Sequence, residues 1–246
     1  MAALRDILGD TVDEQTCAFY LDAAGGDVEA ATRLFFAQNE EQSQPASRQP
    51  SQPIASTQSA MSQFSLPNGR SACTCIAVQA CLEFLRGGAC ANFDPAKIEN
   101  ICRKGVEIYN SVTQRGHLSA EEALLAEEFS SSNVSAAATF QGLTTEANAF
   151  EQELHRIAHG SGAVACVITK PPETLALFMA TSGRMWIFDS HPRPHFGMAG
   201  AHLVEFASIP DCAGWLRTIF PGTDVGGGLM AALYNSFELT PIRVVA

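Results

Sequence analysis

A stretch rich in Gln, Ser and Pro divides the chain into two unequal parts. Residues 39–62, NEEQSQPASRQPSQPIASTQSAMS, contain five Gln, six Ser and three Pro among 24 positions. Such a composition buries too little apolar surface to offset the entropy lost on ordering, so we predict a disordered linker. The linker separates a small N-terminal part, residues 1–38, from a larger part, residues 63–246.

The composition of the whole chain indicates a folded protein that does not bind nucleic acid. Hydrophobic residues make up 46% of the 246 positions and charged residues 17%, which suits a protein with a real core. The net charge of -11 disfavours contact with phosphates and suits a basic protein partner. We expect a monomer.

The sequence also predicts a compartment. No apolar run approaches the roughly 20 residues of a membrane helix, and the N-terminus lacks the pattern of a secretory signal. We therefore expect no membrane segment, a cytoplasmic or nuclear location, and eight cysteines that are reduced thiols.

Three short helical patterns occupy residues 1–38. Leu4, Ile7 and Leu8 share one helix face, and a second pattern begins near Cys17. The residues GGD then interrupt the chain, with Asp27 as the expected N-cap of VEAATRLFFAQ. About 35 residues give a marginal core, for which a compact three-helix bundle is the natural packing.

One segment of this part resembles a known domain family. FYLDAAGGDVEAATRLFF, residues 19–36, is similar to the second helix, loop and third helix of ubiquitin-associated (UBA-like) domains. The resemblance implies that residues 1–38 bind ubiquitin through the loop after the first helix and the end of the third. Those positions correspond here to Leu8, Gly9, Leu34 and Phe35.

Along residues 63–246 the apolar pattern changes from helical to extended. Helical patterns cover CTCIAVQACLEFLRGG, the segment from Pro95 to Tyr109, the segment after Ser119 and residues 147–159, and Ser119 with Glu122 forms a capping-box signature. AVACVITK, TLALFMAT, RMWIFDSH, HLVEFAS and LYNSFELTPIRVV then predict strands, with a short helix in DCAGWLRTIFP. Helices followed by an antiparallel sheet indicate an α+β fold.

The chemistry of the larger part centres on a cysteine and a histidine. Asp189 and His191 are two residues apart, so on a strand they would share a face, and the carboxylate could orient the imidazole. Cys73 follows the turn PNGRSA at the expected start of a helix, where the helix dipole favours the thiolate. Cys75 lies roughly 200° further around the helix and faces elsewhere. Gln63 is well placed to donate its side-chain amide to an oxyanion.

The order of these motifs resembles one protein family. QF, GRSACTCIA and FDSH are similar to motifs in the deubiquitinase domain of herpesvirus large tegument proteins and their non-viral relatives. The resemblance implies a papain-like cysteine protease fold in which Cys73 is the nucleophile, His191 the general base and acid, Asp189 the orienting carboxylate and Gln63 the oxyanion donor. It also implies ubiquitin or polyubiquitin chains as partner.

Three functions remain open from the sequence. The first is a cysteine isopeptidase that cleaves ubiquitin from lysine, for which a tethered UBA-like domain would raise the local substrate concentration. The second is a protease of the same fold that acts on a ubiquitin-like modifier. The third is a non-catalytic ubiquitin adaptor with a papain-like shell.

The sequence does not predict a metal or a cofactor. The cysteines between residues 73 and 90 are spaced C-x-C-x5-C-x8-C, which lacks the paired short loops of structural zinc sites. In HRIAHG, residues 155–160, an arginine stands where the zinc proteases carry glutamate.

Overall fold

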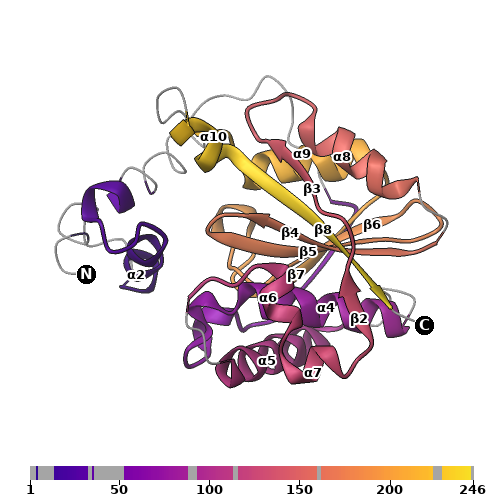
Figure 1. Cartoon of the computed structure of the whole chain (residues 1–246), viewed down its shortest axis with the longest axis horizontal. Coiled ribbons are helices and arrows are strands. Elements are labelled where there is room, and N and C mark those ends of the chain that lie inside the picture. The colour runs from indigo at the N-terminus through magenta and orange to yellow at the C-terminus, as the bar shows by residue number, and fades with distance from the viewer. Residues whose placement is uncertain are drawn as a thin grey trace.

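The structure, a computed structural model, describes residues 4, 14–32, 35, 53–87, 93–112, 116–159, 162–223 and 229–244. Within these residues, eight strands form one sheet in the order β1-β7-β6-β5-β4-β8-β2, and β3 also pairs with β8 (Figure 1). Every pairing between these strands is antiparallel. The predicted α+β arrangement of helices followed by an antiparallel sheet is confirmed.

The helices and strands have the following bounds. The helices are α2 (Glu14–Ala23), α4 (Cys73–Gly87), α5 (Pro95–Ser111), α6 (Ala120–Leu124), α7 (Glu127–Ser130), α8 (Ala149–Ala158), α9 (Ile209–Ile219) and α10 (Leu229–Asn235), with the short 3-10 turns η2 (Gln63–Ser65), η3 (Gly69–Ser71) and η5 (Pro194–Phe196). The strands are β1 (Ala55–Gln58), β2 (Val134–Ala136), β3 (Phe140–Leu143), β4 (Val164–Lys170), β5 (Glu173–Met179), β6 (Met185–Asp189), β7 (His202–Phe206) and β8 (Ser236–Val244).

The sheet is covered by helices on both faces. In Figure 1, α4, α5, α6 and α7 lie on one side of the sheet, and α8 and α9 lie on the other. Alternate residues of the strands enter two separate cores: Val167 and Phe178 join α4 and α5, whereas Ile168 and Leu177 join α8 and α9. Because side chains alternate across a strand and both faces are covered, the central strands read as continuous apolar runs.

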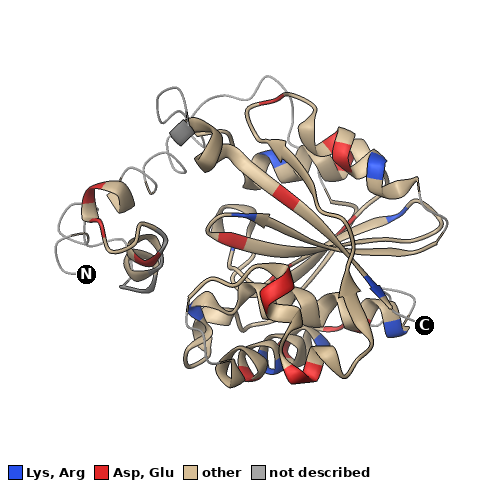
Figure 2. Ribbon diagram, viewed as in Figure 1, with Lys and Arg blue, Asp and Glu red and all other residues tan. Residues whose placement is uncertain are grey.

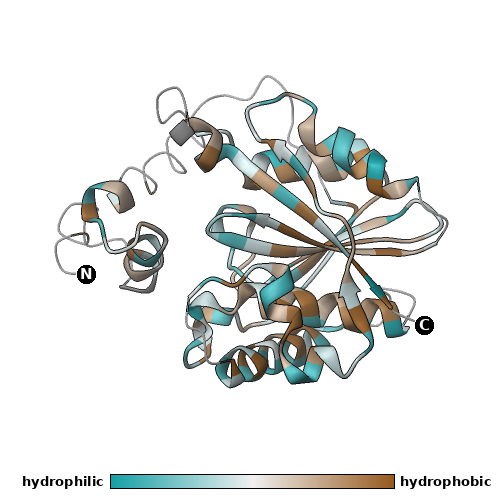
Figure 3. Cartoon of the chain, in the orientation of Figure 1, coloured by the Kyte–Doolittle hydropathy of each residue, from teal (hydrophilic) through white to brown (hydrophobic). Residues whose placement is uncertain are grey.

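Helix α4 is enclosed by its neighbours. It packs between α5 and the strands β4 and β5, and most of its residues are buried. A helix that is hydrophobic on all sides is expected to be buried. In Figure 3, α4 and the central strands are accordingly brown, whereas the outer surface of α8 is teal. Gly105 of α5 allows the close contact, since a Cβ there would lie 2.5 Å from the Cα of Ile76.

The described residues of the N-terminal part form a small cluster of their own. Leu4, Cys17, Tyr20 and Ala31 are buried together, and the rings of Tyr20 and Phe35 meet edge to face at 5.4 Å. After α2 the chain turns at two glycines with positive φ. The Asp27 carboxylate then accepts hydrogen bonds from the amides of two following residues, which confirms the predicted N-cap.

Two expectations about chain organisation require correction. Residues 55–58 of the expected linker form β1, an edge strand that pairs with β7, so the predicted disorder over residues 39–62 is wrong at its C-terminal end. The ASTQ sequence carries no apolar alternation, and its strand is held by backbone pairing. The short strands β2 and β3 were also not predicted. Residues 36–52 lie outside the described residues.

No helix among the described residues is both long enough and apolar enough to cross a membrane.

Candidate active site

The candidate nucleophile, Cys73, is the first residue of α4, as the sequence predicted. The turns η2 and η3 lead into the helix, and Asn68 before η3 has the left-handed φ of 61°. At Gly69 the chain passes close to itself, because a Cβ there would lie 2.1 Å from the carbonyl oxygen of Gln63. The turn therefore needs glycine in order to bring Gln63 close to the segment that enters α4.

Two histidines adjoin the Cys73 thiol, which is 1% exposed. Burial opposes ionisation of the thiol, but hydrogen bonds with His117 and His191, aided by their charges, lower the pKa of Cys73 to about 6. The positive end of the α4 dipole favours the same form. The surroundings of Cys73 therefore favour the thiolate, the form that acts as a nucleophile.

His191 is held by the carboxylate two residues before it. Its Nδ1 lies 2.7 Å from Oδ1 of Asp189, and its backbone amide donates to the same oxygen at 2.8 Å. The expectation that both residues lie on a strand is wrong for His191, since β6 ends at Asp189 and the contact is made across the bend that follows. Burial opposes the charged imidazole, but the charges of Asp189 and Glu173 raise the pKa of His191 to about 10.

A buried arginine holds Asp189 from the other side. The Nε of Arg193 donates to Oδ2 of Asp189 at 2.7 Å, and its guanidinium also forms an ion pair with Glu173 at the start of β5. Burial opposes ionisation of Asp189, but the charge of Arg193 and then that of His191 hold its pKa well below the usual range. Asp189 therefore stays ionised, and its two oxygens are divided between a histidine and an arginine. Sequence reasoning missed Arg193, although it stands two residues beyond the histidine.

Gln63 is fully buried beside this carboxylate–histidine pair. Its Oε1 accepts a hydrogen bond of 2.6 Å from the hydroxyl of Ser190, which lies between Asp189 and His191. Its Nε2 donates to the carbonyl oxygen of Arg70 at 2.9 Å. The side-chain amide has two N–H groups, one of which is held by Arg70, and the two hydrogen bonds together fix the orientation of the amide.

His117 is a member of the site that the sequence analysis did not select. It precedes the N-cap of α6, 44 residues beyond Cys73, and hydrogen-bonds with the thiol. Its Nε2 lies 3.5 Å from Oδ2 of Asp22, a residue of α2. The hydrogen bond with Cys73 raises the pKa of His117, burial opposes this rise, and Asp22 adds to it. Its sequence, RGHLS, contains no motif that would have marked it.

Of the other histidines in the described chain, three are exposed and the fourth, His202, contacts Asp189. His195, His155 and His159 are exposed. His202, the first residue of β7, is buried, with its Nε2 4.0 Å from Oδ2 of Asp189, and burial lowers the pKa of His202. Each described cysteine is a free thiol. Desolvation raises the pKa of Cys75 to about 12, so Cys73 differs sharply from its neighbour.

Of the expected ubiquitin-binding positions, only Phe35 lies within the described residues. Its ring is half-buried against Tyr20 in the core of the N-terminal unit. Leu8, Gly9 and Leu34 lie outside the described residues, so their role stays a prediction.

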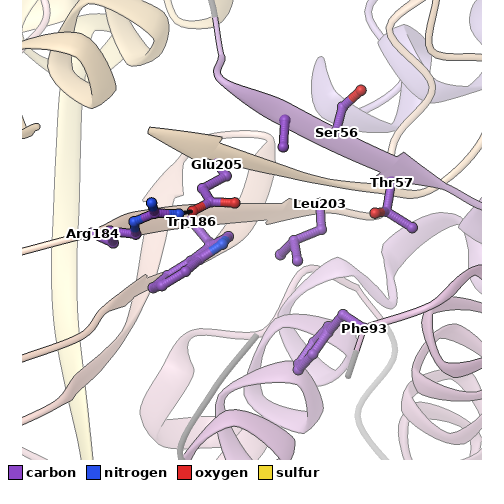
Figure 4. Close-up of a pocket in the computed structure, with 8 residues that line it drawn as sticks. Ser56, Thr57, Phe93, Arg184, Trp186, Leu203 and Glu205 are labelled. Carbon is purple, nitrogen blue, oxygen red and sulfur yellow. Dashed lines mark hydrogen bonds and ion pairs between the residues drawn. The ribbon is translucent and has the colours of Figure 1, made fainter. Parts of the chain in front are cut away.

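The described chain also contains a cavity away from the candidate thiol. It has a volume of about 280 Å³ and lies over β1, β6 and β7, with Trp186, Leu203 and Phe93 on its walls (Figure 4). Arg184 and Glu205 form an ion pair at its rim. No group of three or more His, Cys, Asp or Glu able to hold a metal ion occurs among the described residues.

Comparisons with known proteins address the two parts of the chain separately. Residues 3–42 match the family model of the UBA-like domain. No curated protein matches the chain.

The larger part resembles solved structures. One is the ubiquitin-specific protease encoded by murine cytomegalovirus tegument protein M48, in complex with a ubiquitin-based suicide substrate. It matches with a TM-score of 0.59 and 10% identity, over 77% of this chain and 85% of that chain. The Pseudomonas avirulence protein AvrPphB matches with a TM-score of 0.43 and 10% identity, over 72% of this chain and 94% of that chain.

These findings define the fold of the larger part and the domain type of the smaller one. The larger part has a papain-like cysteine protease fold, as predicted, and a UBA-like domain precedes it. The fold is shared in particular with the M48 protease of murine cytomegalovirus, which confirms the resemblance to the viral tegument proteases at the level of the fold.

Proposed function

We propose that the protein is a deubiquitinase that hydrolyses the isopeptide bond at the C-terminus of ubiquitin. The observation that carries the proposal is the arrangement of Cys73, at the start of α4, with His191, whose Nδ1 lies 2.7 Å from Oδ1 of Asp189. In this arrangement the pKa of the thiol is lowered to about 6 and that of the imidazole is raised to about 10. Because the pKa of the thiol then lies below that of the imidazole, the two groups form a thiolate–imidazolium pair at neutral pH, as a thiol protease requires.

Two further observations direct the proposal to ubiquitin. The related fold from murine cytomegalovirus is a ubiquitin-specific protease, solved with a ubiquitin-based substrate. The N-terminal residues match a UBA-like domain, and resemblance to ubiquitin-associated domains implies ubiquitin binding. Because two parts of one chain independently point to the same ligand, ubiquitin is the favoured partner. The free thiols agree with a reducing compartment, and we propose a cytoplasmic or nuclear location for a monomeric enzyme.

The chemical steps follow from the positions of the side chains. The Cys73 thiolate attacks the carbonyl carbon of the last ubiquitin residue, and the carbonyl oxygen becomes an oxyanion. The remaining N–H of Gln63 and the backbone N–H of Cys73, at the start of α4, stabilise this oxyanion. His191 then gives its Nε2 proton to the departing lysine amine as the carbon–nitrogen bond breaks, which leaves a thioester.

Hydrolysis of the thioester uses the same groups in reverse roles. Neutral His191 takes a proton from water, the resulting hydroxide attacks the thioester carbon, and the Cys73 thiolate departs. Asp189 holds the imidazole ring through Nδ1 throughout, while Arg193 keeps Asp189 ionised. No cofactor takes part in these steps.

The test is covalent capture by ubiquitin that carries a C-terminal propargylamide. We expect the intact chain to form an adduct, Cys73→Ala to form none, and Cys75→Ala to react like the intact chain. The pair of variants is matched, because both cysteines are buried in the first turn of α4. Capture only by probes made from a ubiquitin-like modifier would replace the proposed substrate, and capture by no probe would contradict the enzyme assignment.

A further inference from the structure

The candidate nucleophile is closed off from solvent. Cys73 is 1% exposed and His191 is 2% exposed, so the tail of a ubiquitin molecule cannot reach the sulfur in this arrangement. A protease site of this kind must open for its substrate. The residues that surround the thiol therefore indicate which part of the chain has to move.

A carboxylate of the UBA-like unit, which comprises the described residues 4, 14–32 and 35, lies at the rim of the site. Oδ2 of Asp22, near the end of α2, accepts a hydrogen bond of 3.0 Å from the Ser71 hydroxyl. The same oxygen lies 3.5 Å from Nε2 of His117. Ser71 stands two residues before Cys73, and His117 hydrogen-bonds with its thiol. Asp22 thus contacts two neighbours of the candidate nucleophile, although Asp22 and Ser71 are 49 residues apart in the sequence.

An apolar contact accompanies this polar one. Phe64, the residue after Gln63, packs against the buried cluster of the UBA-like unit that contains Tyr20. The Phe64 ring centroid is also 5.8 Å from that of His191, so the phenyl ring lies between the UBA-like core and the candidate general base.

The contact between the two units includes one pair of ionisable groups of opposite type, Asp22 and His117. The described residues of the UBA-like unit carry four carboxylates and neither lysine nor arginine: Glu14, Asp22, Asp27 and Glu29. In Figure 2 the described residues of this unit are red or tan. Asp22 lies opposite His117, with 3.5 Å between Oδ2 and Nε2, so the two groups form an ion pair whenever the imidazole is protonated.

We propose that the UBA-like unit is docked on the substrate face of the protease domain through Asp22 and the cluster around Tyr20, and that it closes the site over Cys73. Docking and the binding of a ubiquitin tail exclude each other, because both need the space above the thiol. The identity of the excluded substrate as ubiquitin rests on the proposed function, whereas the docking does not.

The contact is small enough to be reversible. The Asp22 side chain remains 53% exposed, so its ion pair with His117 is partly screened by solvent. The 17 residues between Phe35 and Pro53 span at most about 60 Å when extended, which lets the unit leave the face without breaking the chain. A unit released in this way is also free to bind ubiquitin.

The test measures access to the thiol in the full chain by two reagents. Iodoacetamide reports on Cys73 without any role for ubiquitin, when alkylation of the Cys73 peptide is followed by mass spectrometry. The propargylamide probe reports on entry of a ubiquitin tail. Asp22→Arg replaces attraction to His117 by repulsion, and Asp22→Asn removes the charge while it keeps an acceptor for Ser71. Glu29→Arg is the matched control, an equal charge change at another exposed position of the same unit.

We expect Asp22→Arg to accelerate alkylation about fivefold or more, Asp22→Asn to have a smaller effect, and Glu29→Arg to stay within about twofold of the intact chain. Faster alkylation without any capture of ubiquitin would support the docking and contradict the deubiquitinase proposal. Unchanged alkylation in both Asp22 variants, or equal acceleration by Glu29→Arg, would overturn the docking. Circular dichroism on each variant verifies that the helices remain folded.

Discussion

The carboxylate of Asp189 binds His191 twice, through the ring Nδ1 at 2.7 Å and through the backbone amide at 2.8 Å. One oxygen of Asp189 therefore sets both the position of the histidine backbone and the direction of its ring. The other oxygen is bound by Arg193. The imidazole of His191 is therefore held by the buried, ionised carboxylate of Asp189, and Arg193 balances the charge of that carboxylate. The predictions below depend on this arrangement.

Asp189→Asn should abolish most of the activity while the fold persists. The amide cannot stabilise the imidazolium, so the pKa of His191 falls and the ion pair with Cys73 weakens. We expect kcat/KM on a fluorogenic ubiquitin substrate to fall by about 10²–10⁴. Glu205→Gln, which removes an ion-pair partner of Arg184 at the distant cavity, should leave kcat/KM within about twofold. Equal losses in both variants would indicate a general effect of charge.

Activity should depend on pH in a bell shape. As the pH rises through about 6, Cys73 loses its proton and the rate increases, and as it rises through about 10, His191 loses its proton and the rate decreases. Both limbs are properties of the coupled pair. A profile of kcat/KM between pH 5 and pH 11 measures them, and a rate that first rises near the ordinary pKa of a thiol would refute the ion pair.

His117→Ala should move the acid limb of this profile to higher pH. His117 hydrogen-bonds with the Cys73 thiol, so its loss raises the pKa of Cys73, whereas His191 and Asp189 remain. We expect a loss of several-fold at pH 6 and a rate within about twofold of the intact chain at pH 9. The exposed His195→Ala is the control. If the limb stays in place, His117 does not tune the thiol.

Gln63→Ala should separate thiol reactivity from catalysis. Loss of the oxyanion donor lowers kcat by about 10²–10³, because the amide stabilises a charge that exists only in the transition state. Alkylation by iodoacetamide forms no oxyanion and should be nearly unchanged. Ser190→Ala removes the hydrogen bond that anchors Gln63 and controls for its looser placement. Proportional losses in alkylation and hydrolysis would mean that Gln63 acts only through structure.

Gly69→Ala should destabilise the turn before α4. The added Cβ would lie 2.1 Å from the Gln63 carbonyl oxygen, so the backbone must shift. We expect a loss of about 1–3 kcal/mol in the free energy of unfolding, measured by urea denaturation, together with reduced activity. The control is Gly87→Ala at the end of α4, where a Cβ meets nothing within 4 Å. An equal effect of both substitutions would contradict the close approach at Gly69.

Much of the candidate site could be predicted because its signals are local. Cys73 at a helix start followed from the preceding turn, and the proximity of Asp189 and His191 followed from their spacing of two. The reason for this proximity was predicted wrongly, however, because the bend after β6 brings His191 to Asp189, and the two residues do not share a strand face. The edge strands β1, β2 and β3 escaped prediction because backbone pairing holds them, and it leaves little trace in hydrophobic periodicity.

The sequence by itself determined the two-part organisation of the chain, the helices-then-sheet order and the candidate residues for thiol chemistry. These features depend on composition, apolar period and turn residues, which act over a few positions. Only the tertiary structure decided which groups meet at the sulfur: His117 from 44 residues away, Glu173 behind Arg193, and Asp22 from the other domain. Burial and charge balance among residues distant in sequence arise from packing alone, and they shift the pKa values on which the proposed chemistry depends.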